Sequence, residues 1–397
     1  TAEEQLRIWV IRHLKPRHLP GQQSPVPRRK RLVGRSIQTD NQSDGELGIA
    51  VENDALLPFL LAARATSHNP ESRPVFAEGL ASSYEAFLHT RSTNGAGSTD
   101  EDDDETHEAD INDDVDWYLK HLESLIPRGV SAEIHHPKVA ATVQRVVDIW
   151  RRGEKAVVFC HYVATGRVLR QKVSEAIQAE IRRLGAEKLK LPEEQVTTQL
   201  DLIGKRFFDE DSPLRRACDA EAIELISQYP SLSDRTDDLV EIIRRNVRTP
   251  SFLVRYFPLD REKLDDDAMK AALDTRDLSG LTLRQIIKQF LSFLVERCGT
   301  ADRERYINAV KRIQTGAHFG FDATREYDDN ELQGATPEQL LPNVRLVNGT
   351  TRSDTRQRLM LTFNTPFYPE VLIASSVMAE GVDLHLNCRY VLHHDLC

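Results

Sequence analysis

Four short apolar runs, each followed at once by polar residues, constrain most strongly what this chain of 397 residues can fold into. Short apolar runs with polar ends are typical of strands buried inside a parallel sheet. Helical spacing fills the intervals, in the order strand, helix, long helical block, strand, helix, strand, loop and strand. This order predicts an α/β fold with a parallel sheet and right-handed crossovers. The four runs are 156–160, 345–347, 371–374 and 390–392.

The longest interval, residues 184–341, is charged and mainly helical by the period of its apolar residues. Connections between strands and helices in α/β units are normally short, so a helical insertion of this length indicates a purpose of its own. A brace on DNA, a surface for a protein partner and autoinhibition all remain open. The expected helices are 193–208, 212–228, 236–246, 265–273, 283–297 and 301–315.

The first part of the chain combines helical patterns with segments of opposite charge. Residues 91–116 are rich in Asp and Glu and poor in apolar side chains, which predicts a mobile loop. Residues 28–31 read Arg-Arg-Lys-Arg, so the formal net charge of −10 decides neither for nor against a nucleic-acid partner. Apolar residues recur at helical spacing in 54–65, 74–90, 115–125 and 135–150.

Cysteine usage and hydropathy indicate a cytoplasmic protein with no membrane segment. The five cysteines are scattered and form no C-x-x-C pair, so neither a disulfide framework nor a zinc site is expected. The longest apolar runs are shorter than a membrane span, and no charged-then-apolar leader opens the chain.

Polar residues at the carboxyl ends of the predicted strands are the candidate ligand-binding residues. His161 and Tyr162 follow the first strand, and Thr165 is expected to cap the helix that continues to residue 183. A strand end beside a helix N-terminus can hold an anion, because free N–H groups and the helix dipole both point there. The loop after residues 371–374 contains two serines, a glutamate, a glycine and an aspartate, and such loops bind ligands in open α/β sheets.

One nucleotide-binding signature is rejected. Residues 104–107 read Asp-Glu-Thr-His, which matches the string of a helicase Walker B motif. The residues before it are acidic, whereas a Walker B aspartate needs a hydrophobic strand to hold it against magnesium. No G-x-x-x-x-G-K-[ST] phosphate loop occurs in the chain, so this match has no partner.

Three blocks, in chain order, resemble the second RecA-like lobe of superfamily-two helicases, and most of all the Swi/Snf ATPases. Residues 158–165, Val-Phe-Cys-His-Tyr-Val-Ala-Thr, resemble motif IV. Val-Asn-Gly-Thr at 347–350, with Arg356 and Phe363, resembles the next block. Residues 371–384 resemble motif V, and the run that begins at Tyr390 resembles the strand after it. The blocks cover about a quarter of the chain.

The resemblance implies a role for each residue of these blocks. Hydroxyls and backbone amides hold nucleic-acid phosphates without reading sequence. Motif V also faces ATP, which implies that Glu380, Gly381 and Asp383 bind the nucleotide. Gly381 would let the backbone approach closely, and the Asp383 carboxylate could accept a hydrogen bond from a ribose hydroxyl. The implied nucleic-acid contacts are His161, Tyr162, Thr165, Gly349, Thr350, Arg356, Ser375 and Ser376.

Two departures from the family limit what is expected of the chain. One is the long helical insertion, and the other is that the chain stops before motif VI and lacks the first lobe with its phosphate loop. ATP with Mg²⁺ would be bound mainly by that first lobe, so we expect no catalytic residue, no metal ligand and no ATP hydrolysis in this fragment. The expected parts are an N-terminal linker and helical segment (1–134), the RecA-like lobe in two pieces (135–183 and 342–397) and the insertion (184–341).

The chain is therefore expected to be the carboxyl-terminal lobe of an ATP-dependent translocase on double-stranded DNA. A helicase lobe with so large an insertion suggests a bacterial enzyme in defence against foreign DNA. Its expected partners are DNA, the first lobe of the same protein and a protein bound at the insertion. Two alternatives stay open. One is a non-catalytic DNA-binding or scaffold module that retains the lobe, and the other is a helicase on single-stranded DNA or RNA.

Overall fold

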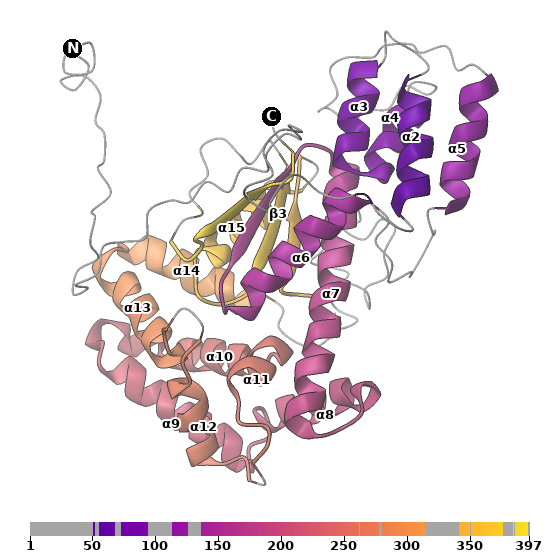
Figure 1. Ribbon diagram of the computed structural model, residues 1–397. Helices are drawn as coiled ribbons and strands as arrows, with labels where there is room; N and C mark the ends of the chain where they lie inside the picture. The colour runs from indigo at the N-terminus through magenta and orange to yellow at the C-terminus, as the bar shows by residue number, and fades with distance from the viewer. Residues whose placement is uncertain are drawn as a thin grey trace, which may run out of the picture. The chain divides into compact units, whose positions relative to one another are not determined.

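The computed structural model describes residues 51, 55–67, 73–93, 113–125, 136–261, 263–277, 280–313, 341–349, 351–375, 384 and 386–395 (Figure 1). The basic run at 28–31 lies outside these residues. Helices α4 and α5 extend into the two ends of the acidic segment 91–116, and its middle lies outside the described residues.

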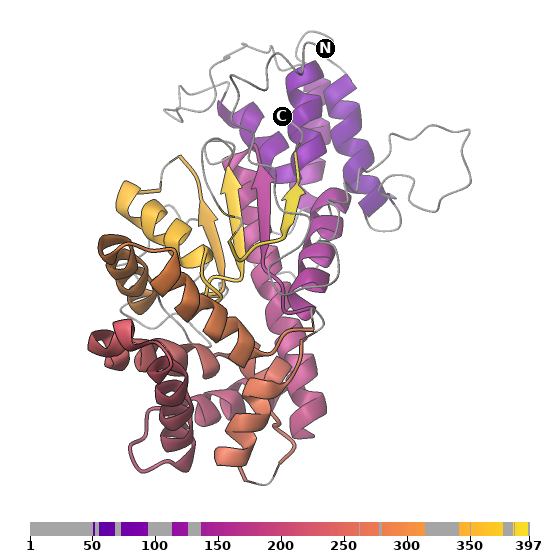
Figure 2. The ribbon, with the colours of Figure 1, turned by 90° about the vertical axis from the view of Figure 1, so that its left-hand side faces the viewer.

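The strands form one parallel sheet in the order β2-β3-β1-β4, which confirms the predicted α/β class (Figure 2). In register, Ala156 lies opposite both Val371 and Tyr390, and Val344 lies opposite Val371. The four carboxyl ends are therefore brought to the same edge of the sheet. The strands are β1 (Ala156–Cys160), β2 (Val344–Val347), β3 (Val371–Ser375) and β4 (Tyr390–His393).

Alternate strand residues bury the two faces of the sheet in two different apolar clusters. Val158 and Ile373 belong to the cluster that includes Leu169 of α7 (Val163–Leu189). Val157 and Leu372 belong to the cluster that includes Leu359 and Phe363 of α15 (Ser353–Phe363). Full burial of each aliphatic side chain stabilises the fold by about 1.5–3 kcal/mol. Helix α6 (Pro137–Arg151) adds Val143 and Trp150 to the first cluster.

The insertion shares its core with the sheet. Helix α7 has 27 residues, starts at the end of β1 and continues past the expected boundary at residue 183 into the insertion. The apolar cluster that contains Val158 also contains Leu253 and Phe290 of the insertion, so no separate core divides the two parts. The insertion comprises α8 (Glu193–Arg206), α9 (Pro213–Ser227), the 3-10 helix η2 (Pro230–Arg235), α10 (Thr236–Val247), α11 (Pro250–Tyr256), α12 (Asp266–Asp274), α13 (Leu283–Glu296) and α14 (Thr300–Arg312).

Four helices that precede α6 in the chain have an apolar cluster of their own (Figure 1). Ala62, Leu80, Phe87 and Leu122 are among its buried members, and none of its residues belongs to either cluster of the sheet. We call these helices the N-terminal bundle. They are α2 (Leu56–Ser67), α3 (Arg73–Ser82), α4 (Tyr84–Thr93) and α5 (Asp113–Leu125).

In the part of the chain that the structure describes, no helix has the length and apolar character needed to cross a membrane.

Candidate functional site

The loops that follow the predicted strands β1, β2 and β3 begin together at the carboxyl edge of the sheet. His161 and Tyr162 follow β1 and lead into α7, while Gly349 lies between β2 and α15. The N-cap residues of α7 and α15, Tyr162 and Arg352, provide no side-chain capping hydrogen bond. The first N–H groups of two helices therefore lie at this edge without a cap from the side chain of their N-cap residue, as far as the described residues show, and such groups attract anions.

The β1 loop is fixed by a carboxylate from the end of β4. The backbone N–H of His161 donates to Oδ2 of Asp395 at 2.9 Å. The rings of His161 and Tyr162 meet edge to face, with their centroids 5.0 Å apart. His161 is exposed and Tyr162 is half-buried, so both rings are accessible from the edge.

Thr165 lies inside α7, and the prediction that it caps this helix is wrong. The helix begins at Val163, after the extended residue Tyr162. The Thr165 side chain is fully buried, and its hydroxyl lies 2.7 Å from Oγ of Ser82 and 2.9 Å from Oγ of Ser83. Both serines belong to the N-terminal bundle or its α3–α4 turn, so the Thr165 hydroxyl is engaged by the protein itself.

Arg356 closes the loop between β2 and α15. Its Nη2 donates to the backbone carbonyls of Asn348 at 3.3 Å and of Gly349 and Thr351 at 3.2 Å. The backbone N–H of Asn348 donates to Oγ1 of Thr351 at 3.0 Å. These contacts hold Asn348, Gly349 and Thr351 against Arg356, and Gly349 is exposed. The direct role of Arg356 in this structure is to position that loop.

Ser375 ends β3 with a buried hydroxyl that has no hydrogen-bond partner among the described residues. Its side chain is 1% exposed. Strand alternation places it on the same face as Ile373, the face that α7 covers, and it pairs in register with Cys160. A buried polar group without a partner costs about 1–3 kcal/mol, so a ligand that reached this hydroxyl would recover part of that cost.

The remaining candidates, Thr350, Ser376, Glu380, Gly381 and Asp383, lie outside the described residues. The structure therefore brings together His161, Tyr162, Gly349 and Ser375 at the sheet edge, with Arg356 behind the Gly349 loop.

Asp395 is a site residue that was not predicted from the sequence. Besides the His161 N–H, it accepts a hydrogen bond from Ser82 Oγ at 2.9 Å, and its Oδ1 lies 3.1 Å from the Lys138 ammonium. Burial would raise the pKa of Asp395, but the His161 N–H and the nearby His394 and Lys138 outweigh it and hold this pKa below its usual range. The available signal was its position, because Asp395 lies within a few residues of the end of the fourth apolar run, at the carboxyl end of a predicted strand.

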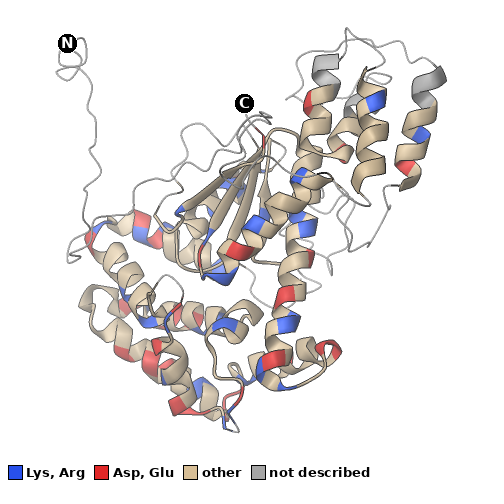
Figure 3. Ribbon diagram, in the orientation of Figure 1, with Lys and Arg blue, Asp and Glu red and all other residues tan. Residues whose placement is uncertain are grey.

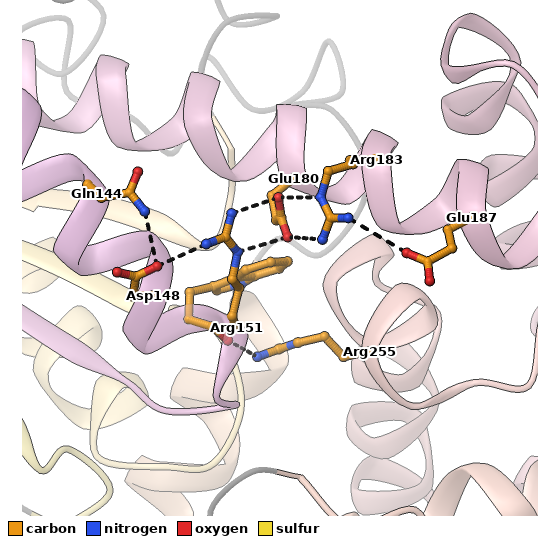
Figure 4. Close-up of polar contacts among 8 residues, drawn as sticks. Gln144, Asp148, Arg151, Glu180, Arg183, Glu187 and Arg255 are labelled. Atoms are coloured by element: carbon orange, nitrogen blue, oxygen red, sulfur yellow. Dashed lines mark hydrogen bonds and ion pairs between the residues drawn. The ribbon is translucent and has the colours of Figure 1, made fainter.

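A second polar network lies where α6, α7 and the insertion meet, and it is structural (Figure 4). Glu180 accepts hydrogen bonds from Arg183 and Arg151, which lower its pKa to about 2 although burial opposes them. Arg255 donates to the backbone carbonyl of Trp150 at 3.0 Å. These contacts fasten helices to one another, and each polar group faces a protein partner.

Charges on the insertion are mixed in sign. Figure 3 shows acidic and basic residues interspersed along its helices. Many are joined in ion pairs, such as Arg244 with Asp219 at 2.8 Å and Arg235 with Glu304 at 2.7 Å. Paired charges of both signs make a poor track for a phosphate backbone, which binds through unneutralised Lys and Arg. The site at the sheet edge therefore remains the better candidate for an anionic ligand.

Among the residues that the structure describes, no group of three or more His, Cys, Asp or Glu side chains could hold a metal ion. Comparison with known proteins adds no relative: no family model, curated protein or solved structure matches this chain.

Proposed function

We propose that this chain is the second RecA-like lobe of a Swi/Snf-like, ATP-dependent translocase, and that the carboxyl edge of its sheet holds the phosphate backbone of double-stranded DNA. The proposal rests on the sequence resemblance given above. The observation that supports it best is that, among the described residues, two helix N-termini without a cap from their N-cap side chains and the Ser375 hydroxyl without a hydrogen-bond partner meet at one sheet edge. Together these groups supply hydrogen-bond donors and no base-reading surface, as backbone recognition requires.

Each described residue has a part in this proposal. His161 and Tyr162 contact the strand from the β1 loop, and Ser375 donates its hydroxyl from the end of β3. Gly349 presents its backbone, and Arg356 keeps that loop in place. Thr350 and Ser376 extend the same two loops.

The nucleotide half of the proposal concerns Glu380, Gly381 and Asp383. They would face ATP across a cleft completed by a first RecA-like lobe, which would also supply most of the contacts to Mg²⁺ and the phosphates. Phosphoryl transfer depends on placing magnesium, lysine and arginine together, so this chain contributes to the site and does not complete it.

The proposal is tested by the binding of fluorescently labelled duplexes of two unrelated sequences, measured by anisotropy over a series of salt concentrations. We expect similar dissociation constants for the two sequences and a linear fall of log affinity with log salt concentration, since phosphate contacts release counterions. Absence of binding, or a strong preference for one sequence, would contradict the proposal. Tighter binding of single-stranded DNA or RNA would favour a helicase on those strands.

A scaffold that binds DNA without chemistry is the second candidate. In the intact protein, ATP hydrolysis stimulated by duplex DNA separates the translocase from this scaffold. A protein that binds duplex and shows no stimulated hydrolysis would support the scaffold alone.

A further inference from the structure

The N-terminal bundle meets the sheet through polar groups, and its apolar core stays separate. The buried apolar residues of α2 to α5 form one cluster, which shares no member with the clusters on the two faces of the sheet. The insertion is the opposite case, because its core is continuous with the α7 face. Separation of the bundle from the sheet would therefore leave both apolar cores intact and expose mainly groups that water can solvate.

A chain of hydroxyls runs from the bundle to the sheet edge. Asp395 can only accept when ionised, so the proton of the Ser82 hydroxyl is directed to its Oδ2. The Thr165 hydroxyl then donates to Ser82, and the Ser83 hydroxyl donates to Thr165. Ser83 Oγ in turn accepts the backbone N–H of Ala86 at 3.0 Å. Each hydroxyl has one proton, so this order uses every donor along the chain.

Two histidines complete the junction. His394 Nε2 lies 2.9 Å from the carbonyl of Ser82, and its Nδ1 lies 2.9 Å from the Thr142 hydroxyl. His136 Nε2 lies 2.7 Å from the carbonyl of Leu80. A carbonyl can only accept, so both histidines donate through Nε2 and hold the α3–α4 turn against the sheet edge.

We propose that the α3–α4 turn is a removable cap on the phosphate-binding edge, held by Ser82 and Ser83 and released when nucleic acid binds. This inference rests on the proposed function. Two donors that a phosphate at the β1 loop would use are already occupied: the Thr165 hydroxyl by the two serines, and the His161 N–H by Asp395. The Asp395 carboxylate accepts hydrogen bonds from the His161 N–H, the Ser82 hydroxyl and the Lys138 ammonium. The same three donors would suit a phosphate oxygen.

The cap sets the fraction of molecules whose β1 loop is open. The apparent association constant for DNA is that of the open form multiplied by this fraction, so a closed cap weakens binding. The variant Ser82→Asp places a second carboxylate beside Asp395 and opens the cap by charge repulsion. The matched control is Ser227→Asp, which adds the same charge at an exposed site on the insertion helix α9. The added negative charge alone would weaken DNA binding in both variants, so a gain in affinity cannot arise from charge.

The decisive measurements are hydrogen exchange of α3 and α4 and duplex binding by anisotropy. We expect Ser82→Asp to exchange faster in α3 and α4 and to bind duplex about tenfold tighter than Ser227→Asp. Faster exchange with unchanged or weaker binding would overturn the cap. Failure of every variant, and of the unmodified chain, to bind duplex would overturn the proposed function, and the cap with it.

A second measurement needs no substitution, and it decides the matter if Ser82→Asp does not fold. Saturating duplex should speed exchange of the α3 and α4 amides in the unmodified chain while it slows exchange at residues 161–166. Slower or unchanged exchange of α3 and α4 in the bound state would show that the bundle stays in place, which leaves DNA binding intact as a function and rejects the cap.

Discussion

The carboxylate of Glu370, one residue before β3, forms a buried ion pair with the guanidinium of Arg255 on the insertion helix α11. Glu370 also accepts hydrogen bonds from Trp150 Nε1 and from Asn343 Nδ2, both at 2.8 Å. Burial would raise the pKa of Glu370, but Arg255 and these hydrogen bonds hold it below its usual range. One carboxylate thus joins α6, the insertion and the residues just before β2 and β3.

Loss of the Glu370 charge should destabilise the whole chain. In Glu370→Gln the Arg255 guanidinium stays buried without a counter-charge, and breaking a buried pair in this way costs about 3–5 kcal/mol. Chemical denaturation gives the free energy of unfolding. Asp302→Asn, which breaks the exposed pair with Arg305, is the control and should change this free energy by less than about 1 kcal/mol. Similar changes in the free energy of unfolding from both substitutions would show that the buried pair contributes no more to stability than the exposed pair.

Stability should fall as the pH drops from 6.5 towards 4, because His136 is buried in its neutral form. Burial lowers the pKa of His136 to about 4, with Lys138 and His394 acting in the same direction, while the Leu80 carbonyl and Asp395 oppose it. Between pH 4 and pH 6.5, His136 is protonated in the unfolded chain and neutral in the folded chain. The free energy of unfolding therefore has its full value, as far as His136 is concerned, above pH 6.5. Protonation of His136 in the unfolded chain lowers it by about 3 kcal/mol once the pH reaches 4.

The variant His136→Asn isolates this effect. His136 is the N-cap of α6 and accepts the Val139 N–H, and Asn is a favoured N-cap that cannot titrate. Denaturation midpoints measured from pH 7 to pH 4 should fall less steeply in the variant than in the unmodified chain. Parallel profiles would mean that other groups, such as His394 or the carboxylates, account for the acid sensitivity.

Ser375→Ala should separate stability from binding. The substitution removes a buried hydroxyl that has no partner among the described residues, so the free energy of unfolding should rise by about 1 kcal/mol. Duplex affinity should fall several-fold, since the proposed phosphate contact is lost. Ser174→Ala is the matched control, because its hydroxyl in the interior of α7 is also buried and also lacks a partner in the part of the chain that the structure describes. It should reproduce the gain in stability with unchanged affinity; a loss of affinity in both would remove Ser375 from the site.

Charge reversal at the start of α15 should weaken DNA binding and its salt dependence. Arg352→Glu places a negative charge beside the first turn of that helix, and we expect the slope of log affinity against log salt concentration to decrease by about 1 to 2. Arg297→Glu, at the exposed end of α13, makes the same charge change in the insertion and should have little effect. Reversal of Arg356 would weaken binding too, but it would also release the three carbonyls that hold the Gly349 loop.

Strands β1, β2 and β3 were predictable because each is a short, mainly apolar run that the sheet buries on both faces. The prediction that the fourth run is also buried is wrong, because β4 lies at an edge of the sheet and its residues alternate between half-buried and exposed. Gly153, whose backbone angle φ is 79°, follows the end of α6, a position where glycine is common. Helix α11 was missed, since seven residues are too few for an apolar period. A signal was present in Thr249 and Pro250, which cap and begin that helix. The expected helix at 74–90 is two helices separated at Ser83, a break that has no Gly or Pro to mark it.

The site was predictable only as far as strand ends determine it. His161, Gly349 and Ser375 follow from the rule that parallel strands place their carboxyl ends at one edge. The engagement of Thr165 does not follow, because its partners Ser82 and Ser83 lie more than eighty residues earlier in the chain. These contacts depend on how the N-terminal bundle docks on α7, and a local pattern of apolar residues does not predict that docking.

The order of the strands in the sheet has a consequence for biosynthesis. Strand β1 lies between β3 and β4, and both neighbours come after the whole insertion in the chain. When β1 leaves the ribosome it therefore has no neighbour to pair with, whereas the helices from α7 to α14 can already pack on one another. The nascent chain must keep an apolar strand from self-association until β3 and β4 are made. From this topology we expect a chaperone that binds short apolar segments to assist folding during translation.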